Sequence, residues 1–417
     1  MEVFEKWESD IRGYCRKYPT VFATASNARQ VDENGKSYID FFAGAGVLNF
    51  GHNNARMKRA MIAFLEADGV AQSLDMYTTT KRRFIKAFAE TILVPRKMDY
   101  KMQFMGPTGT NAVEAALKLA RKVTGRPGVY AFSHGFHGMT LGSLACTANS
   151  YFRHAAGVPM DYVTRVAFEN SPGGGMNHIR ELSCALNDAS SGLEKPAAFL
   201  VEPVQAEGGV NVASREWLHA VQKLAHDNGA LLIFDDIQAA CGRTGSFFSF
   251  DGMDLSPDII CLAKGLGGYG VPIAMNLVKT EHDRHWSPGE HTGTFRGQGL
   301  SFVAGTEALS YFKDDRLMDD VKRKGDIMRR RLLSLVPSSA DSGIEVRGKG
   351  MMQALDVADG STANTIAGEC FEKGLLIGPC GTGGRVLKLI PPLTIPDDDL
   401  AEGLDIFADV VKQYLAA

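Results

Sequence analysis

The sequence lacks the long apolar segments that a membrane protein or a secreted protein needs. None of its 417 residues belongs to an uninterrupted run of the roughly 18–20 apolar residues that a membrane-spanning helix requires. The first ten residues, MEVFEKWESD, are charged and lack the apolar centre of a secretory signal peptide. We therefore expect no membrane partner and a cytoplasmic location.

The sequence also lacks an excess of charge of either sign and a disulfide-like cysteine pattern. It has 45 basic and 48 acidic side chains, a formal net charge of −3, and no basic stripe that could neutralise many phosphates. We therefore expect no nucleic-acid partner. The seven cysteines are scattered and contain no CxxC pair, which predicts reduced thiols that fill small buried spaces.

Internal repeats, low-complexity tracts and obvious linkers are absent as well. Hydrophobic residues form 45% and charged residues 22% of the chain, which excludes a largely disordered protein. The length predicts two or three domains, or one large α/β unit with additions. Many of the 45 glycines follow apolar strands, which indicates backbone held close to a ligand.

Short apolar runs alternate with amphipathic helical segments in the middle of the chain. Three runs are apolar on both faces and are predicted to be buried strands: AAFLV at 197–201, LLIF at 231–234 and DIICL at 258–262. Residues 215–228 have apolar side chains at helical spacing, and Ser214 precedes them as an N-cap. This alternation predicts an α/β fold with a mainly parallel sheet and helices on both faces.

The two ends of the chain have a different pattern. Residues 20–50 contain a hairpin signal with an Asn-Gly turn, and residues 320–417 mix helices with short strands. We therefore expect a large central domain at 51–310 and a smaller α+β domain built from 1–50 and 311–417.

Polar side chains follow the predicted strands at the point where each strand ends. Asp235 and Asp236 follow the second of these strands, and Lys264 follows the third. Glu202 follows the first. Because the carboxyl ends of parallel strands meet at one edge of a sheet, we expect these side chains to converge. Each of these residues alone is common at a strand end, so it is their combination that indicates a functional site.

A short polar loop before a helix predicts a binding site for a phosphate group. Thr108, Gly109 and Thr110 precede a helix predicted over 111–124, whose first N–H groups and dipole favour an anion. The loop is not a P-loop, because no Gly-Lys-Ser/Thr follows it. A phosphate cradle combined with a lysine and an aspartate indicates pyridoxal phosphate (PLP), a cofactor that requires both side chains.

Six ordered motifs in the sequence are shared with a known family of enzymes. They are TGTNAVEAALKLAR at 108–121, HGFHGMT at 134–140, VEPVQAEGG at 201–209, LLIFDDIQAACGRTG at 231–245, KGLGGYG at 264–270 and HTGTFRG at 291–297. These motifs resemble those of the class III (ornithine/ω-amino acid type) aminotransferases, PLP-dependent enzymes of fold type I. The resemblance covers nearly the whole chain. It implies a large domain with a mainly parallel seven-stranded sheet and a smaller α+β domain.

Longer stretches point to one group within that family. They are DFFAGAGVLNFGHNN at 40–54, LDMYTTTKR at 74–82, GPTGTNAVEAALKLARKVTGR at 106–126 and GEHTGTFRG at 289–297. These stretches look like diaminobutyrate–2-oxoglutarate aminotransferases, which occur in ectoine synthesis and in the supply of diaminobutyrate for siderophores. The resemblance implies reversible transfer of the 4-amino group between L-2,4-diaminobutyrate and 2-oxoglutarate, giving L-aspartate 4-semialdehyde and L-glutamate.

The resemblance also implies roles for residues around the cofactor ring. Lys264 would bond to the cofactor aldehyde as a Schiff base and then move a proton during the reaction. Asp235 would pair with the protonated ring nitrogen. Ile237 and Phe136 would pack on opposite faces of the ring, and Gln238 would lie near the ring hydroxyl.

Further residues are implied at the phosphate and at a subunit interface. Gly109 and Thr110 would hold the phosphate, and Thr294 would reach the phosphate of the neighbouring subunit. The expected assembly is therefore a homodimer or a dimer of dimers with active sites at the interface. The expected cofactor site also includes three further residues: Thr108, His137 and Glu202.

One position departs from the family pattern. The family usually has an arginine before the apolar-Pro-Pro segment, where it binds the substrate α-carboxylate. Lys388 occupies this place here, with Arg385 three residues earlier, and a lysine lacks the bidentate fork of arginine. Glu207 is expected to cover the Lys388 charge when an ω-amine enters, and Tyr77 is a further expected substrate-binding residue.

We expect no metal site. His134 and His137 have H-x-x-H spacing, but no third ligand lies near them in the sequence. The EHDRH run at 281–285 is predicted to be a solvated face.

Three alternatives remain open at this point. One is another ω-aminotransferase that acts on ornithine, 4-aminobutyrate or a diamine. The second is a nucleotide-dependent ATPase that uses Asp235 and Asp236 as a metal pair, although the P-loop lysine is missing. The third is a non-catalytic binding protein of the same fold, although Lys264 and Asp235 are both retained.

Overall fold

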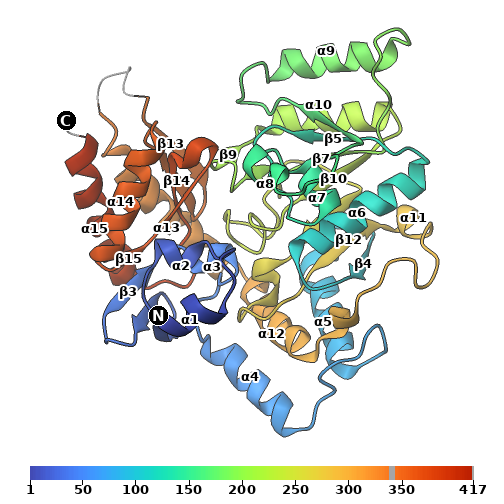
Figure 1. The fold of residues 1–417 in the computed structure, drawn as a ribbon. Coiled ribbons are helices and arrows are strands. Elements are labelled where there is room, and N and C mark those ends of the chain that lie inside the picture. The colour runs from blue at the N-terminus through green and yellow to red at the C-terminus, as the bar shows by residue number, and fades with distance from the viewer. Residues whose placement is uncertain (338–342, 416–417) are drawn as a thin grey trace.

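A seven-stranded sheet forms the centre of the structure, a computed structural model that describes residues 1–337 and 343–415. The strand order is β4-β12-β11-β10-β7-β5-β6 (Figure 1). The strands are β4 (Tyr100–Phe104), β5 (Val129–Phe132), β6 (Val163–Val166), β7 (Ala198–Val201), β10 (Leu231–Asp235), β11 (Ile259–Leu262) and β12 (Met275–Lys279). Neighbouring strands from β6 to β11 are parallel, and β12 is antiparallel to both β11 and β4. The predicted mainly parallel sheet of an α/β fold is therefore confirmed.

The three strands predicted to be buried, β7, β10 and β11, lie side by side and are buried at every residue. Successive side chains of a strand point to opposite faces of the sheet. Leu232 and Phe234 of β10 accordingly pack in a cluster with Trp217 of helix α10 (Arg215–Asp227). Ile233 packs in a separate cluster with Leu117 of helix α6 (Gly109–Thr124). Apolar residues on both faces of the strand thus require a helix on each face.

The ends of α6 and α10 follow from local capping. The Ser214 side chain accepts a hydrogen bond from Trp217 N at the start of α10, as the sequence predicted. Helix α6 ends at Gly125, whose φ of 69° is the left-handed conformation that glycine tolerates. Helix α6 begins at Gly109 rather than at the predicted residue 111, because the extended residue Thr108 already serves as its N-cap.

Two smaller four-stranded sheets combine segments from the ends of the chain. One contains β1 (Phe22–Ser26), β2 (Arg29–Asp32), β3 (Ser37–Asp40) and β15 (Leu375–Leu376), and the other contains β13 (Glu345–Lys349), β14 (Met352–Asp356), β17 (Val386–Leu389) and β16 (Gly378–Cys380). The predicted hairpin is present as β2 and β3, and β3 pairs in parallel with β15. The two ends of the chain therefore share a sheet (Figure 1). The domain boundaries at residues 50 and 310 stay predictions.

The remaining elements surround or connect these sheets. The longer helices are α4 (Ala55–Glu66), α5 (Thr79–Phe88), α9 (Met176–Asn187), α12 (Gly299–Leu309), α13 (Arg316–Leu333), α14 (Gly360–Glu372) and α15 (Asp397–Leu415). The short helices and strands are α1 (Glu2–Trp7), α2 (Tyr14–Lys17), α3 (Ala43–Gly46), α7 (Leu141–Cys146), α8 (Ser150–His154), α11 (Thr280–Asp283), β8 (Val204–Gln205) and β9 (Asn211–Val212).

Two sequence expectations can be compared with the described chain directly. Among its helices, none combines the length and the apolar character that crossing a membrane demands. All seven cysteines are free thiols, and five are buried. Cys15 and Cys184 are exposed, so the expectation of buried cysteine is wrong for these two.

Candidate active site

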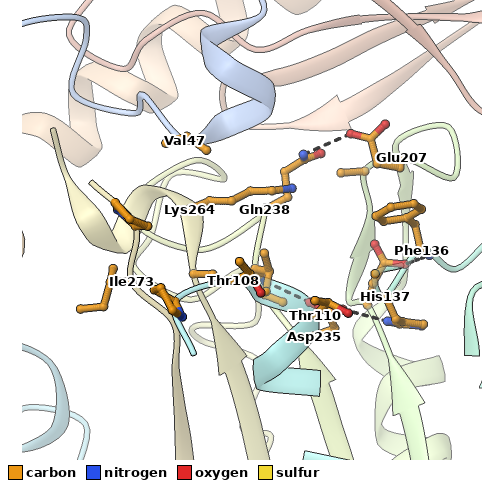
Figure 2. A pocket seen from close by; sticks show the side chains of 18 of the residues that line it. Val47, Thr108, Thr110, Phe136, His137, Glu207, Asp235, Gln238, Lys264 and Ile273 are labelled. Carbon is orange, nitrogen blue, oxygen red and sulfur yellow. Dashed lines mark hydrogen bonds and ion pairs between the residues drawn. The ribbon is translucent and has the colours of Figure 1, made fainter. Parts of the chain in front are cut away.

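The carboxyl ends of the central strands face a cavity of about 330 Å³ (Figure 2). The cavity is lined by eleven of the residues proposed from the sequence: Thr108, Gly109, Thr110, Phe136, His137, Glu202, Glu207, Asp235, Ile237, Gln238 and Lys264. They come from the end of β10, from segments that follow β5, β7, β10 and β11, from the loop between β8 and β9, and from the start of α6. Segments far apart in the sequence therefore supply polar groups to one cavity.

Lys264 lies directly after β11, at the first residue of a short 3-10 turn. Its φ of 47° is a left-handed conformation that is uncommon for a residue with a side chain. Burial lowers the pKa of the Lys264 amine, and the opposing charge of Glu207 does not reverse the shift. A larger share of the amine is therefore unprotonated and able to act as a nucleophile.

Asp235, the last residue of β10, is buried and bonded to a histidine. Its Oδ2 atom lies 2.8 Å from Nδ1 of His137, and its Oδ1 atom accepts a hydrogen bond from Ile237 N at 3.2 Å. The His137 backbone N–H donates to Thr147 Oγ1 at 3.0 Å, which fixes the histidine in this position. The sequence placed His137 in the cofactor site but did not reveal its contact with Asp235. The arrangement orients one carboxylate toward the cavity (Figure 2).

The start of α6 offers N–H groups to the cavity. Within the described chain, the Thr108 side chain makes no cap hydrogen bond to the helix. A Cβ atom at Gly109 would lie 3.0 Å from Ile237 Cδ1, so glycine keeps the approach to the helix start open. The Thr110 hydroxyl lies 2.6 Å from the Thr140 hydroxyl and bonds within the protein. These features fit a phosphate group held mainly by helix N–H groups.

The walls of the cavity include an aromatic ring and a carboxyl group. Phe136 packs edge to face against Phe152, with ring centroids 5.7 Å apart, and lines the cavity. The Phe136 N–H donates to Glu202 Oε1 at 2.8 Å. Burial raises the pKa of the Glu202 carboxyl well above its usual range, and the negative charge of Asp235 adds to that shift.

Glu207 and Lys388 form an ion pair beside the cavity. Lys388 Nζ contacts Glu207 Oε1 and also donates to Gln238 Oε1 at 3.0 Å. Gln238 Nε2 donates in turn to Glu207 Oε1 at 3.1 Å and to Ala45 O at 2.7 Å (Figure 2). Burial alone would raise the pKa of Glu207, but the charges of Lys388 and Lys264 lower it to about 2. Glu207 is therefore a carboxylate that covers a buried ammonium group.

Tyr14 of helix α2 lies close to this ion pair, and sequence reasoning missed it. Its ring packs against Phe42 with centroids 5.1 Å apart. Burial raises the pKa of the Tyr14 hydroxyl, and the negative charge of Glu207 raises it further. No motif around Tyr14 marks this placement, because it depends on the pairing of the terminal segments.

Four other proposed residues do not line the cavity within this chain. Lys388 is buried behind Glu207, and the Arg385 guanidinium lies 3.0 Å from Asp356 Oδ2. Tyr77 is fully exposed and lines a different hollow. Thr294 is exposed, and its backbone carbonyl accepts a hydrogen bond from Gln72 Nε2. Their proposed roles therefore require movement or a second subunit.

Asp235 and Asp236 do not form a pair that faces one site. Asp236 is fully buried outside the cavity, where its Oδ2 atom accepts a hydrogen bond from Ser249 N at 2.9 Å. Burial raises the pKa of the Asp236 carboxyl to about 7. This placement does not fit the metal pair of the ATPase alternative.

The EHDRH run is only partly solvated. His282 Nε2 lies 3.2 Å from Oδ1 of the buried Asp258, so the expectation of a solvated face is wrong for His282. Asp258, Glu281 and His282 are close enough to share a cation, but Lys279 Nζ already lies 2.8 Å from Asp258 Oδ1. The expected absence of a metal stays a prediction.

Comparisons with known proteins agree on one family. The family described as aminotransferase class-III matches residues 14–411. A protein of Halalkalibacterium halodurans named diaminobutyrate–2-oxoglutarate transaminase is 47% identical over 99% of this chain and 96% of that protein. A Streptomyces coelicolor protein of the same name is 48% identical over 99% of this chain and 98% of its own. The crystal structure of ornithine aminotransferase from Toxoplasma gondii superposes with a TM-score of 0.85 at 28% identity, covering 99% of this chain and 94% of that one.

Proposed function

We propose, from the premise that the chain belongs to the class III aminotransferases, that it moves the 4-amino group reversibly between L-2,4-diaminobutyrate and 2-oxoglutarate. The products are L-aspartate 4-semialdehyde and L-glutamate, and in the biosynthetic direction glutamate donates the amine. The chain is a PLP-dependent aminotransferase and acts on small molecules. The likeness along its whole length to diaminobutyrate–2-oxoglutarate transaminases carries the choice of substrate.

The residues around the cavity fit PLP. When bound, PLP supplies an electron sink that makes the carbon next to the substrate nitrogen acidic. Lys264 would bond to the cofactor and then carry the proton between two carbon atoms, as its partly unprotonated amine allows. Asp235, held by His137, would keep a proton on the ring nitrogen. The start of α6 at Gly109 would bind the phosphate.

The ion pair supports a proposal about how two kinds of substrate share one site. Diaminobutyrate presents a terminal amine, whereas glutamate presents a second carboxylate. We propose that Glu207 covers Lys388 when the terminal amine enters and moves away when the carboxylate enters. Because the ammonium of Lys388 is buried, an uncovered state offers a strong site for a carboxylate. Arg385, three residues earlier on the chain, and Tyr77 remain proposed substrate-binding residues.

Glu207→Ala is expected to shift the preference toward glutamate. The variant leaves Lys388 uncovered, so the ratio of kcat/KM for glutamate to kcat/KM for diaminobutyrate should rise at least about tenfold. Both values are measured on folded protein, with Glu90→Ala as a matched control at an exposed glutamate. An unchanged ratio contradicts the switch. The double variant Glu207→Gln with Lys388→Met removes both charges and should lose the preference for either substrate if the pair sets it.

We propose a homodimer, or a dimer of dimers, in which Thr294 of each chain completes the site of its neighbour. The segment around Thr294 is held against residues 72–77, for example by Ser73 N donating to Gly297 O at 3.1 Å. Phe295, Met76 and Tyr77 expose large apolar side chains on this surface, a composition that favours contact with another protein chain. The free thiols support the proposal of a cytoplasmic location.

A panel of amino donors tests the proposed substrate. Purified protein with PLP is supplied with 2-oxoglutarate and, in turn, diaminobutyrate, ornithine, 4-aminobutyrate and putrescine. The expected result is the highest kcat/KM with diaminobutyrate, together with formation of glutamate and an aldehyde product. Activity confined to 4-aminobutyrate or ornithine would replace this proposal with the alternative ω-aminotransferase.

A further inference from the structure

Glu202 is a carboxyl group in the cavity wall whose charge state the reaction does not specify. It follows β7 directly, is only 7% exposed and lines the cavity. Its Oε1 atom accepts the Phe136 N–H at 2.8 Å, which fixes the carboxyl group against the backbone of the aromatic wall. Glu202 is therefore a well-placed polar group beside the proposed cofactor.

Two of the basic side chains near Glu202 already bond to other carboxyl groups. His137 bonds to Asp235, and Lys388 is paired with Glu207. In residues 1–337 and 343–415, no lysine, arginine or histidine forms an ion pair with Glu202. Lys264 lies on the same cavity and its charge lowers the pKa of Glu202, but this effect is smaller than the rise caused by burial and by Asp235.

An ionised Glu202 would place a negative charge without an ion-pair partner beside Asp235. A buried carboxylate without a cation is strongly disfavoured, and of two carboxyl groups that share a site one retains its proton. A further negative charge would also oppose the binding of a phosphate in the same cavity. The raised pKa of Glu202, caused first by burial and then by Asp235, agrees with this argument.

We infer that Glu202 is protonated at neutral pH and presents its O–H to the cavity as a hydrogen-bond donor, while Asp235 keeps the negative charge. Glu202 and Asp235 thus take opposite roles, because His137 bonds only to Asp235. This inference rests on the proposed function for the identity of the ligand, but not for the charge state.

Infrared difference spectroscopy of the full chain tests the inference, first without PLP and then with it. The spectrum of the wild type minus that of Glu202→Gln should contain the carbonyl stretch of a protonated carboxyl group, shifted in D₂O. Glu207→Gln is the matched control, because Glu207 is a carboxylate with a pKa lowered to about 2 by Lys388 and Lys264 despite its burial. That control should remove carboxylate bands only.

Carboxylate bands in the Glu202→Gln difference spectrum overturn the inference. If Glu202→Gln does not fold, glutamate labelled with ¹³C at the side-chain carboxyl is used in the wild type. A labelled acid band supports the inference, and its absence contradicts it. Because only glutamate carries the label, a labelled acid band cannot come from Asp236, a buried aspartate whose pKa is also raised. Failure of the wild type to bind PLP would refute the proposed function and leave the test without PLP unaffected.

A second readout is the pH at which the absorbance of the PLP-loaded enzyme changes. Replacing a neutral acid by a neutral amide should move this pH by less than about half a unit. Loss of an ionised carboxylate would lower it by about one unit or more, because a negative charge that stabilises the protonated form disappears. A fall of that size contradicts a protonated Glu202.

Discussion

Lys264→Ala is expected to lower kcat for the transamination by at least about 10⁴-fold. The substitution removes the amine that is proposed to bond to the cofactor and to move the proton, and the described chain offers no second lysine in the cavity. The rate is measured with diaminobutyrate and 2-oxoglutarate at saturating PLP. Lys101→Ala, at an exposed lysine of β4, is the matched control and should retain wild-type activity.

A mixing experiment shows whether the Lys264→Ala chain is inactive for the expected reason. Thr294→Arg should also be inactive, because it blocks the phosphate site of the neighbouring chain. Equal amounts of the two variants are mixed under conditions in which dimers dissociate and reassociate at random. About half of the dimers are then mixed and have one intact site of two, so roughly a quarter of the wild-type activity should return. No recovery in verified mixed dimers contradicts the shared site, and wild-type activity of Lys264→Ala alone contradicts the mechanism.

Asp235→Asn is expected to lower kcat by about 10³-fold, a loss typical of removing one well-placed electrostatic group from an active site. The amide preserves the shape of the side chain but cannot keep the ring nitrogen protonated. The contact of His137 with residue 235 can persist, so the protein should remain folded. The measurement is kcat together with the absorbance spectrum of the bound cofactor.

Asp236→Asn is the control for this prediction, because it makes the same chemical change at the next residue. Burial raises the pKa of Asp236 to about 7, so this carboxyl group is partly neutral already at neutral pH, and it lies outside the cavity. Its substitution should lower kcat by less than about tenfold. Equal losses for the two variants would contradict the assignment of the ring partner to Asp235.

The parts of the fold that the sequence predicted well are those with local signals. Strands β7, β10 and β11 are apolar on both faces, and a run of that kind has few alternatives to a central strand with helices on each side. Ser214 caps α10 with its own side chain, so the start of that helix can be predicted from neighbouring residues alone. The strand ends then bring Lys264 and Asp235 to one cavity.

The parts that the sequence did not reveal depend on contacts between distant segments. The bond between His137 and Asp235 joins residues 98 positions apart, and the spacing of either motif gives no indication of it. Tyr14 reaches the ion pair from helix α2 near the start of the chain, whereas Lys388 lies on β17 near its end. The burial of Lys388 behind Glu207 likewise depends on packing between different elements.

Charge states were the least predictable feature of the site. Asp235, Asp236 and Glu202 have similar side chains and all lie at the carboxyl end of a strand. Their environments differ: Asp235 bonds to His137, whereas Asp236 and Glu202 are buried without a cation in ion-pair contact in the described chain. Burial, rather than residue type, is therefore the main cause of the raised pKa values of Asp236 and Glu202.

Reductive trapping of the cofactor shows directly whether Lys264 is the residue that bonds to PLP. The purified wild-type chain is incubated with PLP, reduced with borohydride, digested and analysed by peptide mass spectrometry. We expect the cofactor on the peptide that contains Lys264, attached to the Lys264 side-chain nitrogen. A protein that remains unlabelled, or that carries the label only on another lysine, would show that Lys264 does not bond to PLP.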